Sequence, residues 1–214
     1  PDFKHDIADY LAYLKNLARR LNIDVVFNRP ATAEGIRSFA ADYVILATGA
    51  TMEPCPIAGN NALTTIQVLS GREPAGEKIL IMGAGVTGCE TALYLARRGK
   101  QVTLCAREDS PELDTNIMDI HNREMLLRML REEKNITVFR GTIPLRLDGD
   151  GVVADQQGSE KRIPMDSLVF AGRLFSQNGL STSFANAPNV VSIGDCKEPG
   201  TIMDAVWGGF NAVR

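Results

Sequence analysis

Gly83-Ala84-Gly85-Val86-Thr87-Gly88 is a G-x-G-x-x-G stretch near the middle of the 214-residue chain. It follows the apolar run Lys78–Met82, which predicts a buried strand, and it opens the run 86–98, which has helical spacing. This glycine pattern binds a dinucleotide when a strand precedes it and a helix follows it. The sequence therefore predicts a nucleotide-binding turn here. A glycine-rich turn without a ligand is the alternative.

Each glycine of the stretch has its own physical task. Gly83 permits the tight turn out of the strand, Gly85 lets bare main chain approach a pyrophosphate, and Gly88 lets the helix pack close to the strand. The free N–H groups around Val86 and Thr87 add the positive end of the helix. We expect the whole stretch to surround a diphosphate.

The end of the next predicted strand, 101–106, indicates which nucleotide is bound. A site for NAD usually has Asp or Glu there, because the carboxylate holds the ribose 2′-hydroxyl. Here the expected acidic position is Ala106, and Arg107 follows it. An arginine can pair with a 2′-phosphate through charge-assisted hydrogen bonds, so these residues favour NADP over NAD. Glu108 and Asp109 come next and could approach the ribose instead, and Arg107 could also be a solvated strand end.

The sequence around this turn has the pattern of an α/β protein. Strand and helix alternate over five runs, which predicts a parallel sheet with helical crossovers. These runs are 78–82, 86–98, 101–106, 115–133 and 136–139. Three short runs between glycine-rich turns then predict an antiparallel meander. They are 142–147, 151–155 and 161–163, and a buried strand follows at 168–171.

The N-terminal part has a less regular pattern. An amphipathic helix is predicted over 6–21, a short strand over 23–27 and a strand buried on both faces over 43–47. We interpret 48–76, which is rich in Gly and Pro, as a connector between two lobes.

Two polar turns follow predicted strands outside the central pattern. The strand at 43–47 leads into Thr48 and Gly49. A strand at 190–193 leads into Gly194 and Asp195, and a helix over 202–214 closes the sequence. A carboxylate at a strand end can accept a hydrogen bond from a sugar-like hydroxyl, although Asp195 could also be a turn or capping residue.

The composition excludes several classes of function. Acidic residues number 26 and basic residues 23, so the formal net charge of −3 offers no basic field for nucleic-acid phosphates. The apolar runs are much shorter than the roughly 20 residues of a membrane-spanning helix. The four cysteines lack metal-ligand spacing, and no metal site is predicted. We expect Cys89 and Cys105 to be buried reduced thiols, which favours a cytoplasmic location.

Together these segments resemble the FAD/NAD-linked reductase fold. The resemblance is greatest to the C-terminal region of old-yellow-enzyme-type NADH:flavin oxidoreductases, the family of 2,4-dienoyl-CoA reductase and trimethylamine dehydrogenase. It covers nearly the whole chain. The segments that carry it are 44–49, 83–90, 168–172 and above all 191–214, in which Gly194-Asp195-Cys196 leads to Pro199-Gly200.

The resemblance implies nested domains. Residues 75–172 would form a Rossmann-like NAD(P)-binding insert, and 1–74 and 173–214 would be the two parts of a partial FAD-type domain. In that family Asp195 would bind the ribityl chain of FAD, and Gly172 would lie by the nicotinamide. The remaining expected FAD contacts are Thr48, Gly49 and Gly194, with Met203 and Asp204 facing the flavin.

The sequence departs from the family pattern. The family's outer domain begins with its own G-x-G-x-x-G for the FAD pyrophosphate, and no such element precedes residue 6. The barrel that carries FMN and iron–sulfur cysteines is absent as well. We therefore expect a fragment, inactive alone, whose partners are the barrel and the N-terminal FAD-binding portion of a longer parent chain. The run 172–178 also lacks the Pro- and Asn-rich pattern of relatives, which affects the nicotinamide pocket.

The expected function is that of a nucleotide-binding fragment of a flavin-dependent oxidoreductase, which passes hydride from NAD(P)H to flavin. The cofactors perform this chemistry, so no side chain is predicted to be catalytic. Two alternatives remain open. One is a non-catalytic ADP-binding structural module, as in trimethylamine dehydrogenase. The other is the flavin subunit of a glutamate-synthase-like assembly.

Overall fold

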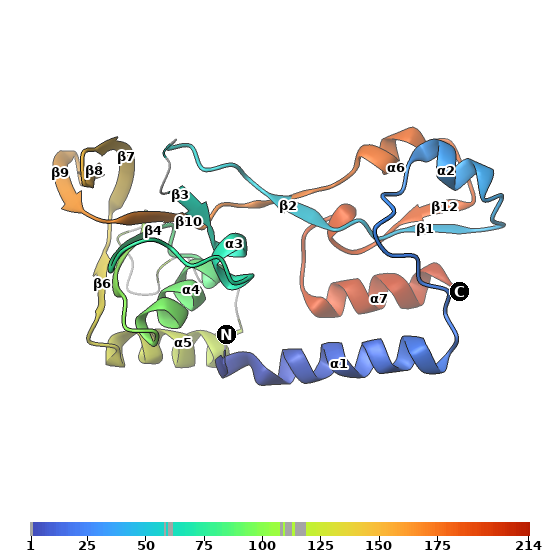
Figure 1. Ribbon diagram of the computed structural model, residues 1–214, viewed down its shortest axis with the longest axis horizontal. Helices are drawn as coiled ribbons and strands as arrows, with labels where there is room; N and C mark the ends of the chain where they lie inside the picture. Colours follow the sequence, from blue (N-terminus) through green and yellow to red (C-terminus); the bar gives the residue numbers. More distant parts are fainter. Residues whose placement is uncertain (1, 58, 60–61, 108, 110–112, 114–118) are drawn as a thin grey trace. The chain divides into compact units, whose positions relative to one another are not determined.

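The computed structural model of the protein describes residues 2–57, 59, 62–107, 109, 113 and 119–214 (Figure 1). These residues form two compact units. Unit 1 comprises Pro1–Ala8 and Pro54–Gly172, and unit 2 comprises Asp9–Glu53 and Arg173–Arg214.

Unit 1 is built on a five-stranded parallel sheet of order β3-β10-β4-β5-β6. The strands are β3 (Ala62–Thr64), β4 (Lys78–Met82), β5 (Gln101–Cys105), β6 (Ile136–Phe139) and β10 (Ser167–Phe170). The helices are α3 (Thr65–Leu69), α4 (Val86–Ala96) and α5 (Ile120–Glu132), with a 3₁₀-helix at Asp2–Lys4 and the start of α1 (His5–Arg20). An antiparallel meander contains β7 (Thr142–Asp148), β8 (Gly151–Gln156) and β9 (Ser159–Pro164).

Both faces of this sheet are covered, which explains the continuous apolar runs of its strands. Ile79 and Ile81 of β4 point into a core shared with α4 and α5, whereas Leu80 between them points into a second core beneath the meander. All three side chains are buried. The unit therefore has three layers, namely helices, sheet and meander, and the predicted α/β class with a parallel sheet and an antiparallel meander is confirmed.

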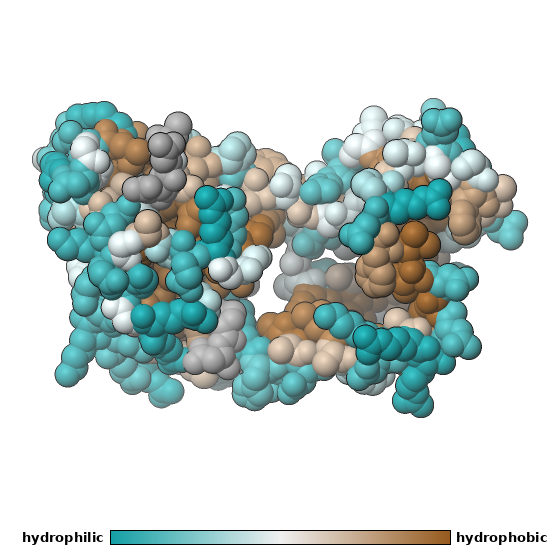
Figure 2. Space-filling model, viewed as in Figure 1, coloured by the Kyte–Doolittle hydropathy of each residue, from teal (hydrophilic) through white to brown (hydrophobic). Residues whose placement is uncertain are grey.

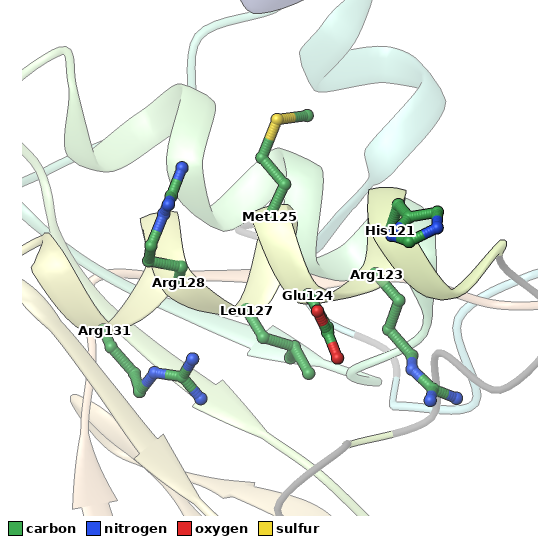
Figure 3. A pocket seen from close by; sticks show the side chains of 7 residues that line it. All are labelled: His121, Arg123, Glu124, Met125, Leu127, Arg128 and Arg131. Carbon is green, nitrogen blue, oxygen red and sulfur yellow. The ribbon is translucent and has the colours of Figure 1, made fainter.

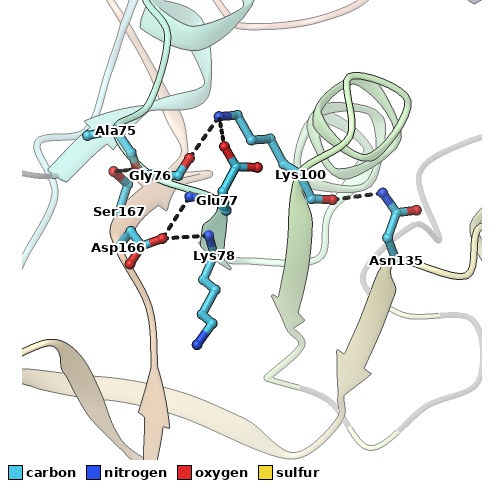
Figure 4. A network of polar contacts seen from close by, with 8 residues as sticks. All are labelled: Ala75, Gly76, Glu77, Lys78, Lys100, Asn135, Asp166 and Ser167. Carbon is cyan, nitrogen blue, oxygen red and sulfur yellow. Dashed lines mark hydrogen bonds and ion pairs between the residues drawn. The ribbon is translucent and has the colours of Figure 1, made fainter.

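A polar network joins the starts of the strands in unit 1 (Figure 4). The Asp166 carboxylate accepts hydrogen bonds from the main-chain N–H groups of Lys78 (2.8 Å) and Glu77 (2.7 Å). These two bonds hold the pKa of Asp166 below its ordinary value. The Lys100 ammonium donates to the Gly76 carbonyl at 2.7 Å, and the Asn135 amide donates to the Lys100 carbonyl at 2.8 Å. This network lies at the amino edge of the sheet, opposite the edge where nucleotides bind in such sheets.

Unit 2 contains two small sheets. In the first, β1 (Val44–Leu46) pairs in parallel with β12 (Val190–Ser192), and in the second, β2 (Ala50–Met52) pairs antiparallel with β11 (Leu174–Ser176). The helices are the rest of α1, α2 (Ala33–Ser38), α6 (Gly179–Ser183) and α7 (Ile202–Ala212), with a 3₁₀-helix at Gly194–Cys196.

The elements of unit 2 leave much apolar surface open. No residue of α1, α2, α6 or α7 is buried. Trp207 of α7 is 56% exposed and Phe27 is 79% exposed. Figure 2 shows apolar side chains, in brown, open to solvent in the region of α1 and α7. Unit 2 therefore has no closed core of the kind found in unit 1.

Three expectations from the sequence are wrong in part. The segment 23–27 forms no strand, because no strand of the described residues pairs with it, and its apolar side chains are exposed. The strand expected over 43–47 is shortened to β1, and only Leu46 is buried, because a two-stranded sheet has no cover on its faces. The segment 48–76 is more than a connector, since it supplies β2, β3 and α3.

Most other elements agree with the sequence pattern. The helix expected over 115–133 is described as α5, and the part at 115–118 lies outside the described residues. All four cysteines are free, and Cys89 and Cys105 are buried as expected. Burial raises the pKa of the Cys105 thiol to about 12, so this group stays protonated and unreactive near neutral pH.

Replacing Asp166 by Asn should lower the free energy of unfolding at pH 7, because the amide removes the charge on which the two main-chain N–H groups converge. The folded pKa of Asp166 lies below the unfolded value of about 3.9. Its contribution is therefore present above that value and is lost as the pH falls through the folded pKa.

Urea unfolding at pH 7 and pH 3 measures this effect. The gap between wild type and Asp166→Asn should shrink at the lower pH. Asp24→Asn is the control, because Asp24 is exposed and has no hydrogen bond to any described residue. An unchanged gap at the two pH values would contradict the assignment.

Candidate functional site

The predicted glycine turn links β4 directly to α4. Gly83 has a φ of +108°, in the left-handed region, and its N–H donates to the Cys105 carbonyl of the neighbouring strand at 3.1 Å. Gly85 is the N-cap of α4, which begins at Val86. The turn therefore lies at the carboxyl edge of the parallel sheet, where such sheets bind ligands.

Two glycines of the turn are required by close packing. A Cβ on Gly83 would lie 2.8 Å from the main-chain oxygen of Ala171, and a Cβ on Gly88 would overlap the carbonyl oxygen of Gly83. No side chain therefore separates the main chains where β4, α4 and the end of β10 meet. Any larger residue would push α4 away from the sheet.

The start of α4 offers bare main chain to an anion. The first N–H groups of a helix have no partner within the helix. Gly85 has no side chain that could cap them. Val86 is half-buried and Thr87 is exposed, so the N–H groups at this end lie near the surface. A helix start with free N–H groups and the positive end of the helix dipole is the kind of place where proteins bind phosphate groups.

The end of β10 lies beside the glycine turn. Phe170 is in register with Met82, and the Ala171 N–H donates to the Met82 carbonyl at 2.9 Å. Gly172 follows directly, and a Cβ there would overlap the ring of Phe170. The structure therefore places the predicted residue Gly172 at the same sheet edge as residues 83–88.

The end of β5 contributes Ala106 and Arg107 to this edge. Ala106 is fully buried, and its N–H donates to the Phe139 carbonyl at 2.8 Å. Arg107 is exposed, and its side chain has no hydrogen bond or ion pair to another described residue. Of the two acids considered as competitors, Glu108 lies outside the described residues. The Asp109 carboxylate accepts a hydrogen bond from the Gln157 amide at 2.9 Å.

An ion pair between a half-buried lysine and a buried glutamate joins the N-terminal segment to α4. The Lys4 ammonium lies 2.5 Å from the Glu90 carboxylate, whose side chain is 9% exposed. Phe3, beside Lys4, packs against the core that contains α4. Sequence reasoning assigned no role to this pair. The only signal was an acidic residue among small and apolar ones in the predicted helix, and the position of its partner could not be deduced from it.

The second group of predicted residues lies in unit 2, where β1 and β12 end. The Ile193 N–H donates to the Leu46 carbonyl at 3.0 Å, so the two strand ends meet. Thr48 donates its hydroxyl to the Gln177 carbonyl at 2.9 Å, and the Gly49 carbonyl accepts the Gln177 N–H at 3.0 Å. These contacts attach the turn after β1 to the segment that follows β11.

Asp195 and Asp204 both have local partners. The Asp195 carboxylate accepts the Gly200 N–H at 3.2 Å, which is a turn-closing role. Asp204 and Thr201 form a capping box at the start of α7, and the hydrogen bond from the Thr201 hydroxyl holds the pKa of Asp204 below its ordinary value. Gly194 and Asp204 line one hollow of about 540 Å³, and Met203 is 68% exposed.

Residues 14–209 match the model of a family described as pyridine nucleotide-disulphide oxidoreductase. The chain belongs to the pyridine nucleotide-disulphide oxidoreductase family.

Relatives in this family are reductases of larger size. The chain is 31% identical over 222 residues to cinnamate reductase of Clostridium sporogenes and 28% identical over 244 residues to metal reductase of Desulforamulus reducens. These matches cover 100% and 99% of the chain, and 32% and 36% of the relatives. A solved structure of 2-naphthoyl-CoA reductase has a TM-score of 0.86 at 25% identity, over 97% of this chain and 32% of that one. The chain thus spans about a third of the length of these relatives.

A hollow elsewhere on unit 1 is distinct from the glycine turn. It has a volume of about 620 Å³, and the described residues that line it belong to α5 (Figure 3). Arg128 and Met125 point to one side of the helix, and Arg131 points to the other.

No group of acidic, His or Cys side chains in the described part of the chain could hold a metal ion. In that same part, no helix is long and apolar enough to cross a membrane.

Replacing Gly88 by Ala should disturb both folding and binding. The added methyl overlaps the Gly83 carbonyl, so α4 must shift, at a cost of about 1–3 kcal/mol in the free energy of unfolding. We expect ADP to bind about tenfold more weakly, which corresponds to about 1.4 kcal/mol. Gly179→Ala is the control, because nothing lies within 4 Å of a Cβ there. Calorimetric titration with ADP measures the effect, and equal affinities of the two variants would argue against a phosphate site at this turn.

Proposed function

We propose that this chain is the nucleotide-binding part of a flavin-dependent oxidoreductase that passes hydride from NAD(P)H to flavin. The observation that carries the proposal is the bare main chain of residues 83–88 at the start of α4, beside Gly172 at the same sheet edge. Membership of the pyridine nucleotide-disulphide oxidoreductase family supports it. In this proposal the insert comprises residues 75–172.

The residues of unit 1 fit a pyridine nucleotide. Positions 83 and 88 have no room for a Cβ, which seats the start of α4 directly at the end of β4. The first main-chain N–H groups of the helix would there face a diphosphate. Arg107 stands exposed at the strand end where the adenosine ribose is expected. The Asp109 carboxylate, which would favour NAD, is engaged with Gln157. These observations support NADP over NAD.

The residues of unit 2 fit only part of an FAD site. Gly194 and the start of α7 line one hollow, but the Asp195 carboxylate is turned to the Gly200 N–H. The described residues of unit 2 contain no glycine-rich strand-to-helix turn that could hold an FAD pyrophosphate. We propose that the N-terminal portion of an old-yellow-enzyme-type parent supplies this element, and that FMN and the iron–sulfur cluster belong to its barrel.

The open surface of unit 2 supports this partner. A hollow of about 420 Å³ is lined by Val26, Ile36, Phe39 and Ile45, among others, next to the unpaired segment 23–27. A two-stranded sheet is marginal in water without further strands or a helix against its face. A strand-forming segment of the parent chain would cover these apolar side chains.

In the working enzyme the chain's own residues bind and orient. Residues 83–88 would hold the diphosphate, Arg107 would hold the adenosine end, and Gly172 would lie at the nicotinamide end. The chemistry that nicotinamide and flavin supply when bound is hydride transfer. Among the described residues no acid or base is needed for it.

A second candidate function is an ADP-binding structural module without hydride transfer. The observation that favours it is that residues 83–88 and Arg107 all serve the ADP half of a dinucleotide. The nicotinamide half is represented by Gly172 alone, and the ring of Phe170 occupies the direction of its missing side chain.

Stopped-flow reduction of the complete parent enzyme distinguishes the two candidates. Hydride delivery predicts that NAD(P)H bleaches the flavin absorbance within the turnover time. If the organic substrate reduces the flavin and NAD(P)H does not, the module without hydride transfer is correct.

Replacing Arg107 by Ala should weaken NADPH binding far more than NADH binding. The lost pairing with a phosphate is worth roughly 1.5–3 kcal/mol, or about ten- to a hundredfold in affinity. Calorimetric titration with ADP, NADH and NADPH measures this. Arg128→Ala on α5 is the control, because that side chain is 68% exposed and pairs with Glu132 of the same helix. Equal losses for both nucleotides would exclude a 2′-phosphate contact.

A further inference from the structure

The junction between β6 and β7 contains an irregularity at the carboxyl edge of the sheet. Ala106 donates its N–H to the Phe139 carbonyl and accepts the Thr142 N–H, both at 2.8 Å. Two residues, Arg140 and Gly141, therefore lie opposite Ala106, which is a β-bulge. Bulges are common beside active sites, where they change the direction of a side chain.

This bulge places a second arginine next to the expected ribose position. Arg140 follows β6, which is the parallel neighbour of β5, so Arg140 and Arg107 stand at adjacent strand ends. Both residues are exposed. The Thr142 hydroxyl donates to the Arg140 carbonyl at 2.9 Å and stabilises the bulged main chain.

The meander reaches the same edge through its β8–β9 turn. The Gln157 N–H donates to the Gly141 carbonyl at 3.1 Å, and the Gln157 side-chain amide donates to the Asp109 carboxylate at 2.9 Å. Gly141 has a φ of +56°, and a Cβ there would lie 3.1 Å from the Gln157 side chain and 3.7 Å from Asp109. The glycine thus leaves the space in which Gln157 and Asp109 meet.

We infer that Gln157 is a specificity-determining residue: it holds the Asp109 carboxylate against the meander, so that Arg107 and Arg140 are the side chains that a ribose 2′-phosphate meets. The inference rests on the proposed nucleotide site and refines it. A carboxylate is the group that selects a 2′-hydroxyl and repels a 2′-phosphate. The bulge at Arg140 and Gly141 brings an arginine to the ribose position, and the contact of Gln157 with Asp109 holds a carboxylate away from it. The ribose would therefore face positive charge.

The test compares two probes that differ only in the 2′-phosphate, 5′-AMP and 2′,5′-ADP, by calorimetric titration of the full chain. In the wild type we expect 2′,5′-ADP to bind at least about tenfold more tightly than 5′-AMP. Arg107→Ala and Arg140→Ala should each reduce this preference about tenfold, because each costs 2′,5′-ADP more affinity than it costs 5′-AMP. Arg128→Ala should leave the preference unchanged.

The role of Gln157 is tested by asking whether a second substitution restores the preference for 2′,5′-ADP that its removal lowers. Gln157→Gly keeps the turn, because glycine accepts the φ of +53° at this position, and it removes the side-chain hydrogen bond to Asp109. We expect the preference for 2′,5′-ADP to fall about two- to fivefold, the size of an exposed charge interaction. Asp109→Asn added to Gln157→Gly should restore it, because the freed side chain is then neutral. A merely structural role of Gln157 would show no such rescue.

The outcomes distinguish the existence of the nucleotide site from the role of Gln157 in its specificity. Failure of the wild type to bind either probe would overturn the proposed nucleotide site and this inference with it. Equal binding of both probes would overturn the inference and the proposed preference for NADP, but not the nucleotide site itself. A preference that survives Arg140→Ala, or a Gln157→Gly loss that Asp109→Asn does not reverse, would overturn only the inference.

Discussion

Contact of main chain with main chain at the end of β4 is the constraint on which unit 1 depends. Gly83 lies against Ala171 of the β10 segment, and Gly88 lies against Gly83 itself. Because these atoms are so close, α4 starts where β4 ends and its first N–H groups remain at the sheet edge. Packing alone would require glycine at 83 and 88, whether or not a ligand is bound. The proposed phosphate site would thus be a direct consequence of how the helix packs on the sheet.

The two edges of the sheet in unit 1 have different tasks. At the amino edge Asp166, Lys100 and Asn135 satisfy the main-chain groups where the strands begin, and this edge is closed by hydrogen bonds. At the carboxyl edge the glycine turn and the arginines remain accessible. The meander covers one face of the sheet, and its β8–β9 turn brings Gln157 to the carboxyl edge.

Unit 2 contains a segment, 23–27, whose residues have a strand pattern but form no strand. Ile23, Val25 and Phe27 have the residue types of a strand, yet they are exposed and unpaired. A strand needs a neighbour for its main-chain hydrogen bonds, and the described residues supply none there. By the same reasoning β1, which has one partner strand and uncovered faces, buries only Leu46. The residue types of 23–27 favour a strand, but no strand forms there. A neighbouring strand is what the parent chain is proposed to supply.

Local sequence was sufficient for β4, the glycine turn, α4, β5 and β6, because each is specified by the period of its apolar residues and by glycine at the turn. Arg107 could also be placed from its position after a strand, whereas the role of Gly172 came from the family resemblance alone. The partners of Glu90 and Asp109 could not, because Lys4 and Gln157 are far away in the sequence and meet them only after the layers have packed. The β-bulge at Arg140 likewise depends on register with Ala106 across two strands. Periodicity specifies which face of a segment is buried, whereas contacts between distant polar side chains are set by how the buried faces come together.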